Sequence, residues 1–204
     1  MTQVPTPQTF QEAYAGEAPW DIGRIQSAFA AIADHVKDPI LDAGCGTGDM
    51  ALYFAAKGHQ VTGLDYLEEP IRRARAKAAE RNLKVDFRVG DATKLTELTD
   101  RFNAVVDSGL FHVFTDDDRR KYVAGLAHVL NPGGRVFLMC FSNEEPGEFG
   151  PRRITRDELK SAFATGWQIQ SIEPNYFEIN PNFKGAKFSE GGPKTWFVTI
   201  ERRT

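Results

Sequence analysis

Cysteine is scarce in this chain of 204 residues, which has only Cys45 and Cys140. Two cysteines are too few for a disulfide framework or for a cysteine-based metal cluster. Both lie in apolar or Gly-rich stretches, where buried thiols are the expectation. We therefore expect no metal site and a reducing, cytoplasmic location.

Long apolar segments and an excess of one charge are missing as well. No apolar run approaches the ~20 residues that span a bilayer, and the N-terminus MTQVPTPQTF lacks the basic and apolar regions of a secretory signal. Lys and Arg number 25 against 28 Asp and Glu, for a net charge of -3. We expect neither a membrane nor a nucleic-acid partner, and the protein to be a monomer or homodimer.

What the sequence does contain is an alternation of strand-like and helix-like segments. Strands are predicted at 39–44, 59–65, 83–91, 101–109 and 135–141, with helices at 49–58, 67–82 and 115–134. A helix at 157–166, begun by a capping box of Thr155 and Glu158, precedes strands at 167–179 and 194–202. This order predicts an α/β fold with a mostly parallel sheet, helices on both faces and an antiparallel strand near the end.

The length suits a single domain over residues 1–204. Within it, residues 1–35 are expected to form a helical lid or arm, and residues 36–204 the catalytic core. Ile25, Phe29 and Ile32 share one stripe, which predicts a helix over 24–35.

The stretch ILDAGCGTGD, residues 40–49, contains three alternating glycines between Asp42 and Asp49. A tight turn needs fewer glycines, and a dinucleotide-binding loop would place a third glycine where Asp49 stands. A carboxylate about 4 Å from a phosphate charge would also cost roughly 4 kcal/mol at an effective dielectric of 20. A ligand with a cationic end fits better, and S-adenosylmethionine has an ammonium that Asp42 can pair with.

Two further carboxylates end the next two predicted strands, Asp65 in VTGLD and Asp91 in VGDAT. A carboxylate at the first position can accept hydrogen bonds from ribose hydroxyls, and one at the second from an adenine amino group. Tyr66 follows Asp65 and can cover an adenine face. Each acid alone also suits a helix cap or a turn, but three at successive strand ends are more specific.

The segments ILDAGCGTGD, GLD, VGDAT, FNAVVDSGLFHVF and LNPGGRVFL together resemble the ordered motifs of class I S-adenosylmethionine-dependent methyltransferases. The resemblance implies a Rossmann-like sheet of seven strands with the last antiparallel, S-adenosylmethionine as cofactor and S-adenosylhomocysteine as product. By this resemblance the cofactor contacts are Asp42, Gly44, Cys45 and Gly46 at the methionine end, Asp65 and Tyr66 at the ribose and beyond, and Asp91 with Ala92 at the adenine.

The stretch after the fourth predicted strand, DSGLFHVF, should face the reacting methyl group. It lacks the Asn/Asp-Pro-Pro-aromatic run of methyltransferases that modify nucleic-acid bases. His112 is a candidate base, with an ordinary pKa near 6.5, or else a histidine packed at a helix start. Asp107 is expected to contact the cofactor amine, to orient the acceptor, or only to close the strand.

Residues 18–26, APWDIGRIQ, resemble the lid segment of thiol, halide and thiopurine-type methyltransferases, and with DSGLFHVF and CFSNEEPG they resemble a branch that methylates heterocycles. This implies that Trp20 covers the cofactor or acceptor and that Ile22 lines the same pocket. Phe111, Phe141 and Phe188 are expected to line an aromatic acceptor site.

The sequence therefore predicts methyl transfer to S, N or O of a small aromatic, heterocyclic or thiol acceptor. Two alternatives stay open, a nicotinamide-dependent oxidoreductase and a catalytically silent cofactor-binding module.

Overall fold

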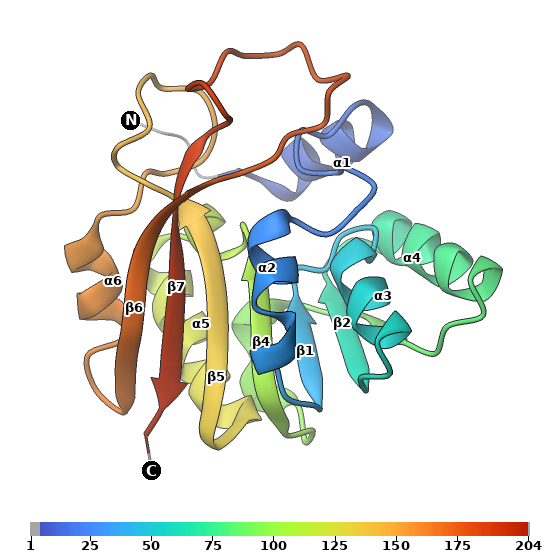
Figure 1. Ribbon diagram of the computed structural model, residues 1–204, viewed down its shortest axis with the longest axis vertical. Helices are drawn as coiled ribbons and strands as arrows, with labels where there is room; N and C mark the ends of the chain where they lie inside the picture. The colour runs from blue at the N-terminus through green and yellow to red at the C-terminus, as the bar shows by residue number, and fades with distance from the viewer. Residues whose placement is uncertain (1–4, 204) are drawn as a thin grey trace.

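The sheet contains seven strands within residues 5–203, the range that a computed structural model describes (Figure 1). The strands are β1 Ile40–Ala43, β2 Val61–Asp65, β3 Asp86–Val89, β4 Phe102–Ser108, β5 Leu130–Phe141, β6 Trp167–Tyr176 and β7 Lys194–Arg202. Their order is β3-β2-β1-β4-β5-β7-β6. The first five strands pair in parallel, and β7 runs antiparallel between β5 and β6. The predicted fold class is confirmed.

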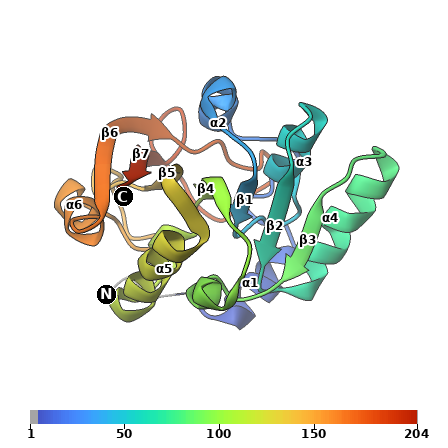
Figure 2. The same ribbon diagram turned by 90° about the horizontal axis from the view of Figure 1, so that it is seen from below.

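Helices cover both faces of this sheet. The helices of the described chain are α1 Pro7–Ala15, which lies beyond the carboxyl ends of the strands, α2 Ser27–Ala31, α3 Asp49–Ala56, α4 Glu68–Glu80, α5 Asp116–Val129 and α6 Arg156–Ala162, with 3₁₀ turns at Ala33–His35, Ala92–Glu97 and Phe111–Val113. Figure 2 shows α2 and α3 on one side of the sheet and α5 on the other. Successive strand residues point to opposite faces, so Ile40 packs in the core with Phe54 of α3 and Leu41 in the core with Leu126 of α5.

The helix predicted over 24–35 is shorter than expected. It spans Ser27–Ala31, because Ile32 leaves helical geometry with φ -102° and ψ 5°. Gln26 is held outside the helix, since its side-chain amide exchanges hydrogen bonds of 2.9 and 2.8 Å with the backbone of Glu178. A contact more than 150 residues away thus sets the start of this helix.

The helix predicted over 115–134 also ends early, at Val129. Leu130 is already extended, with φ -80° and ψ 142°, and pairs with Phe102 of β4. Asn131 precedes Pro132, and a residue before proline is disfavoured in helical geometry. The Asn-Pro-Gly-Gly sequence therefore lies in the first part of β5 and does not end the helix itself.

Both cysteines are free thiols, with Cys140 buried and Cys45 half-buried. Across residues 5–203 no three His, Cys, Asp or Glu side chains gather in a way that could hold a metal ion. In the same range no helix is both long and apolar enough to cross a membrane.

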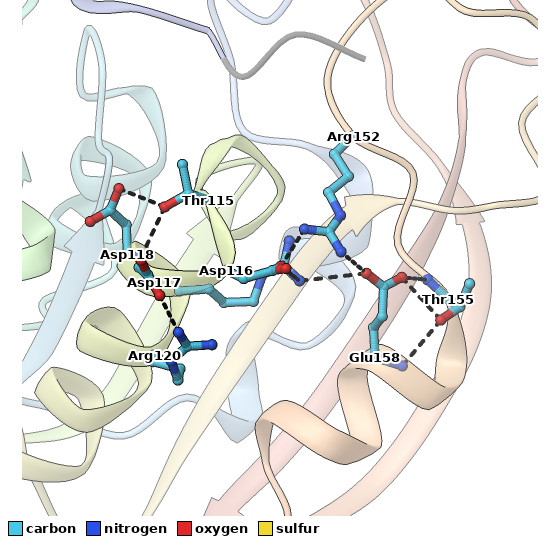
Figure 3. A network of polar contacts seen from close by, with 9 residues as sticks. Thr115, Asp116, Asp117, Asp118, Arg120, Arg152, Thr155 and Glu158 are labelled. Carbon is cyan, nitrogen blue, oxygen red and sulfur yellow. Dashed lines mark hydrogen bonds and ion pairs between the residues drawn. The ribbon is translucent and has the colours of Figure 1, made fainter. Parts of the chain in front are cut away.

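Helices α5 and α6 begin at a shared ionic network, drawn in Figure 3. The Thr155 hydroxyl accepts the N–H of Glu158 at 3.1 Å, and the Glu158 carboxylate accepts the N–H of Thr155 at 2.8 Å. Arg152 bonds to Glu158 and to Asp116 at the start of α5. The predicted capping box is confirmed, and it also joins the two helices that pack behind β4 and β5.

Replacing Thr155 with Ala should lower the free energy of unfolding by about 1 kcal/mol, because the α6 N-terminus loses its hydroxyl cap. Chemical denaturation at pH 7 measures the change. Ser161→Ala, at an exposed position of the same helix, is the control and should stay within about 0.5 kcal/mol of the parent. Equal losses in the two variants would contradict the assigned cap.

Candidate active site

Three of the predicted acids meet at the carboxyl edge of the sheet. Asp42 lies in β1, Asp65 ends β2 and Asp107 lies near the end of β4, and β1 pairs with both of the other strands. Their exposed fractions are 1%, 9% and 0%. Parallel strands present their carboxyl ends along one edge, where open α/β sheets bind ligands, so the fold gathers these residues as the sequence predicts.

The glycine loop after β1 needs glycine for two reasons. Gly44, Gly46 and Gly48 all have positive φ, at 73°, 53° and 84°, which side chains rarely adopt. A Cβ on Gly46 would also lie 2.6 Å from the hydroxyl oxygen of Tyr14, and one on Gly44 3.1 Å from the Cβ of Leu110. The glycines therefore let the side chains of Tyr14 and Leu110 pack directly against the loop backbone.

Asp42 is the unusual member of the three acids. Neither of its carboxylate oxygens has a hydrogen-bond partner among the described residues. Burial, reinforced by the charges of Asp107 and Asp65, raises the pKa of Asp42 to about 8. A buried charge without a partner is costly, so the side chain suits a cationic ligand, which the ammonium of the expected cofactor would be.

Asp65 is bound from two sides by backbone. Its Oδ2 accepts the N–H of Gly46 at 3.0 Å, and its Oδ1 accepts the N–H of Leu67 at 3.0 Å. The carboxylate thus holds the glycine loop against β2, and each oxygen keeps a further lone pair for a ligand hydroxyl. Tyr66 beside it is 39% exposed, which leaves its ring open to a ligand at the surface.

Asp91 caps the 3₁₀ turn that follows β3. Its Oδ1 accepts both the N–H of Thr93 at 2.8 Å and the Thr93 hydroxyl at 2.7 Å. Ala92, the next residue, is buried. The cap uses one carboxylate oxygen and leaves the other for a ligand, so the predicted adenine contact stays a prediction that this geometry permits.

Asp107 is enclosed by donors from the protein. Its carboxylate accepts the N–H of Leu110 at 2.7 Å, the N–H of Phe111 at 3.1 Å and the hydroxyl of Tyr122 at 3.0 Å. Of the three roles considered for Asp107, the geometry favours the structural one. It closes β4 and fixes the turn that places Leu110 against Gly44.

His112 is buried and held in one tautomer. Its Nδ1 accepts the N–H of Phe141 at 2.9 Å, so the proton of the neutral ring is on Nε2. Burial, together with the charges of Arg153 and Arg119, lowers the pKa of His112 to about 3. The interpretation of His112 as a general base is disfavoured, because Nε2 already carries a proton and a second one would create a buried imidazolium beside two arginines.

The N-terminal arm contacts the glycine loop through polar and aromatic groups. The Thr47 hydroxyl donates to Asp21 at 2.9 Å and accepts from Lys77 at 2.8 Å. Trp20 is 40% exposed, and its ring centroid lies 5.8 Å from that of Tyr14. The arm thereby lies beside the loop that the sequence predicted to bind the cofactor.

Sequence reasoning missed two residues of this arm. Tyr14 is 7% exposed, and its hydroxyl lies over Gly46. Asp21, the acid of the PWD sequence at residues 19–21, accepts the hydrogen bond from Thr47. The PWD pattern was a signal for Asp21. For Tyr14 the only signal was its helical spacing from Phe10, which does not say what the ring contacts.

Aromatic rings gather around His112, where the sequence predicts the acceptor site. The ring centroids of Phe141 and Phe177 lie 5.2 and 6.0 Å from that of His112, and Phe188 lies 6.2 Å from Phe141. The structure therefore brings together the predicted Phe141, Phe188 and His112 and adds Phe177. Ile22 is half-buried in the arm, and its N–H donates to the carbonyl of Trp20.

The expectation that Phe111 lines the acceptor site is wrong. The residue is fully buried, its ring lies 5.8 Å from that of Phe163, and the Arg119 guanidinium lies 4.7 Å from the Phe111 ring centroid. The N–H of Phe111 donates to the Asp107 carboxylate. The turn held in this way directs the Phe111 ring into the core between the sheet and helices α5 and α6.

Replacing Asp42 with Asn should stabilise the protein increasingly between pH 4 and pH 8. In this range the unfolded state releases the Asp42 proton while the folded state keeps it, so the stability of the parent falls by about 1.4 kcal/mol per pH unit relative to the variant. Urea denaturation at pH 5, 6, 7 and 8 measures the difference. Glu80→Gln, at an exposed site, is the control, and a pH-independent difference for Asp42→Asn would contradict the assignment.

The chain is similar to known methyltransferases. A methyltransferase domain model matches residues 40–134. A 2-heptyl-1-hydroxyquinolin-4(1H)-one methyltransferase from Mycobacteroides abscessus is 32% identical over 196 residues, which covers 90% of this chain and 85% of that protein.

Solved structures share the fold. One, described as "Conversion of a Disulfide Bond into a Thioacetal Group during Echinomycin Biosynthesis", superposes with a TM-score of 0.84 at 32% identity and covers 97% of this chain and 93% of its own. The Burkholderia thailandensis 1,6-didemethyltoxoflavin-N1-methyltransferase, at 21% identity, a TM-score of 0.68 and coverage of 100% and 93%, shows the same fold. Because the Mycobacteroides abscessus protein is 32% identical to this chain over most of both sequences, the protein belongs to the S-adenosylmethionine-dependent methyltransferases.

Proposed function

We propose that the protein methylates S, N or O of a small aromatic, heterocyclic or thiol acceptor that binds beside His112. The observation that carries this proposal is the group of rings around His112, formed by Phe141, Phe177 and Phe188. It lies at the same edge of the sheet as Asp42 and Asp65. The similarity to methyltransferases named for a hydroxyquinolone and for didemethyltoxoflavin supports a heterocyclic acceptor.

Different residues at the carboxyl edge of the sheet bind different parts of the cofactor. S-adenosylmethionine supplies the electrophilic methyl group when bound. Asp42 forms an ion pair with the ammonium, which gives its carboxylate the partner that it lacks in the protein. Asp65 accepts hydrogen bonds from the ribose hydroxyls, and Asp91 contacts the adenine. Trp20 and Tyr14 cover the glycine loop from the arm and exclude water from it.

His112 acts as a hydrogen-bond donor in this proposal. Its Nε2–H is directed by the bond from the Phe141 N–H to Nδ1, and it makes no bond to a described residue. A donor stabilises an acceptor that is already ionised, such as a thiolate or the oxyanion of an acidic hydroxyl. Arg153, whose guanidinium lies 4.8 Å from the Phe141 ring centroid, contributes positive charge near His112, which favours the ionised acceptor without a protein base.

Of the two alternatives, the nicotinamide-dependent oxidoreductase conflicts with membership of the methyltransferase family. A silent cofactor-binding module would share the family, the fold and Asp42. The aromatic rings beside His112 favour an enzyme that binds an acceptor, and a turnover assay distinguishes such an enzyme from a silent module.

Replacing Asp65 with Ala should weaken binding of S-adenosylhomocysteine roughly 10- to 100-fold, because hydrogen bonds to a charged group are worth about 1.5–3 kcal/mol. Isothermal titration calorimetry measures the affinity. Glu80→Ala, on the outer face of α4, should bind like the parent. An unchanged affinity in Asp65→Ala would show that the ribose assignment is wrong.

Activity should follow the ionisation of the acceptor and not of His112. For a panel of thiols, phenols and hydroxyquinolones, kcat/KM should rise with pH through the pKa of each acceptor, read out as release of S-adenosylhomocysteine. His112→Ala should lower the rate roughly 10- to 100-fold at every pH, since the donor to a charged atom is lost. If kcat/KM changed near pH 6.5 for every acceptor, and this change were absent in His112→Ala, His112 would instead be shown to act as a base.

A further inference from the structure

Lys77 reaches from helix α4 to the glycine loop. Its Nζ donates to the Thr47 hydroxyl at 2.8 Å and to both carboxylate oxygens of Asp49 at 3.0 Å. The lysine is half-buried and Thr47 is buried. None of the roles proposed for the cofactor contacts or for the acceptor site uses this lysine.

The bond from Lys77 fixes the direction of the Thr47 hydroxyl. An ammonium group only donates, so the Thr47 oxygen is the acceptor and its own proton points elsewhere. The Asp21 carboxylate accepts that proton at 2.9 Å, whereas Asp49 lies at 3.5 Å and is already bound by Lys77. Lys77, Thr47 and Asp21 therefore form a directed chain of hydrogen bonds from α4 through the loop to the arm, in which each bond strengthens the next.

The same face of α4 holds the arm at a second point. Arg73 lies four residues before Lys77, a spacing that places both side chains on one side of a helix. The Arg73 Nη2 donates to the carbonyl of Tyr14 at 3.0 Å. Figure 1 shows α1 beyond the ends of the strands, on the side of α4. Helix α4 thus contacts the arm directly at Tyr14 and, through Thr47, at Asp21.

These two points enclose the part of the arm that lies over the glycine loop. Trp20, next to Asp21, has its ring centroid 5.8 Å from that of Tyr14. The Tyr14 hydroxyl oxygen lies 2.6 Å from the place of a Cβ on Gly46. In the proposed function these rings cover the cofactor, so the cofactor leaves when residues 14–21 move away from the loop.

The ion pair with Asp49 does not account for the whole arrangement of Lys77. Asp49 is the first residue of α3, where a carboxylate is already stabilised by the helix N-terminus. A lysine that only balanced this charge would have no need of the Thr47 hydroxyl. The bond to Thr47 is the one that connects Lys77 to the arm.

We infer that Lys77 is a positioning residue that keeps the arm closed over the bound cofactor, because it orients the Thr47 hydroxyl toward Asp21. The inference rests on the proposed placement of the cofactor at the glycine loop and on no property of the acceptor. Lys77, Thr47 and Asp21 then set how long the cofactor and its product stay bound, and not how fast they enter.

The test is the dissociation of S-adenosylhomocysteine, measured by surface plasmon resonance on the immobilised protein. Lys77→Met should raise the dissociation rate about tenfold or more, as for one lost hydrogen bond to a charged group, and change the association rate less than about twofold. Lys84→Met, at an exposed lysine beyond α4, is the matched control and should behave as the parent. An unchanged dissociation rate in Lys77→Met would overturn the inference.

Variants at Thr47 separate this role from the ion pair with Asp49. Thr47→Val removes the hydroxyl but leaves Lys77 beside Asp49, and it should raise the dissociation rate as Lys77→Met does. Thr47→Ser keeps a hydroxyl and should restore the parent rate. Dissociation as in the parent for Thr47→Val would assign Lys77 to the stability of the fold alone and overturn the inference.

A double-mutant cycle tests the connection between Lys77 and Asp21, which are joined through Thr47. Asp21→Ala should raise the dissociation rate by itself. The double variant with Lys77→Met should dissociate no faster than the faster single variant, because either change breaks the same chain of bonds. Effects that multiply in the double variant would show two independent contacts and contradict the chain.

Amide hydrogen exchange locates the effect in the arm. With S-adenosylhomocysteine bound, residues 10–22 should exchange faster in Lys77→Met and Thr47→Val than in the parent, while β1 keeps the exchange of the parent. Equal exchange of residues 10–22 in all three proteins would show that the arm does not depend on Lys77, against the inference.

The Asp65→Ala variant separates this inference from the proposed function. Weaker binding in Asp65→Ala, with dissociation as in the parent for Lys77→Met and Thr47→Val, would leave the cofactor placement standing and overturn the inference. Faster dissociation in the Lys77 and Thr47 variants, without methyl transfer to any acceptor of the panel, would support the inference and overturn the proposed function.

Discussion

Three carboxylates are buried at the ends of neighbouring strands, and the fold compensates their charges to different degrees. Asp107 accepts from two backbone N–H groups and a tyrosine hydroxyl, Asp65 from two backbone N–H groups, and Asp42 from no described residue. The first holds a turn, the second holds the glycine loop while keeping lone pairs for a ligand, and the third is the one we propose to pair with a cation. Burying Asp42 without a partner destabilises the protein until a ligand supplies one.

The region proposed to bind the acceptor depends on contacts between distant segments. The arm reaches the β6–β7 segment through Arg24 and Glu178, and the N–H of Asn180 donates to the carbonyl of Pro19 at 2.8 Å. The segment after β5 is joined to the same region through Glu145. Since the arm also contacts the glycine loop through Asp21, the same connected segments cover the residues proposed to bind the cofactor and those proposed to bind the acceptor.

His112 illustrates how environment decides the chemistry of a side chain. In water its ring would exchange protons near neutral pH, but here one nitrogen accepts a backbone N–H and burial disfavours the charged form. The same ring becomes a fixed donor. An enzyme with such a donor suits acceptors that ionise readily, and this agrees with the positive charges of Arg153 and Arg119 near it.

The order of strands and helices, the glycine loop, the acids at strand ends and the Thr155 cap were all determined by the sequence, because each depends on residues close together in the chain. The tertiary structure decided the rest. It turned Phe111 into the core and selected the His112 tautomer through the N–H of Phe141. It also brought the Phe177 ring to 6.0 Å from that of His112, an approach that depends on packing between segments far apart in sequence, where no local pattern records which ring faces which neighbour.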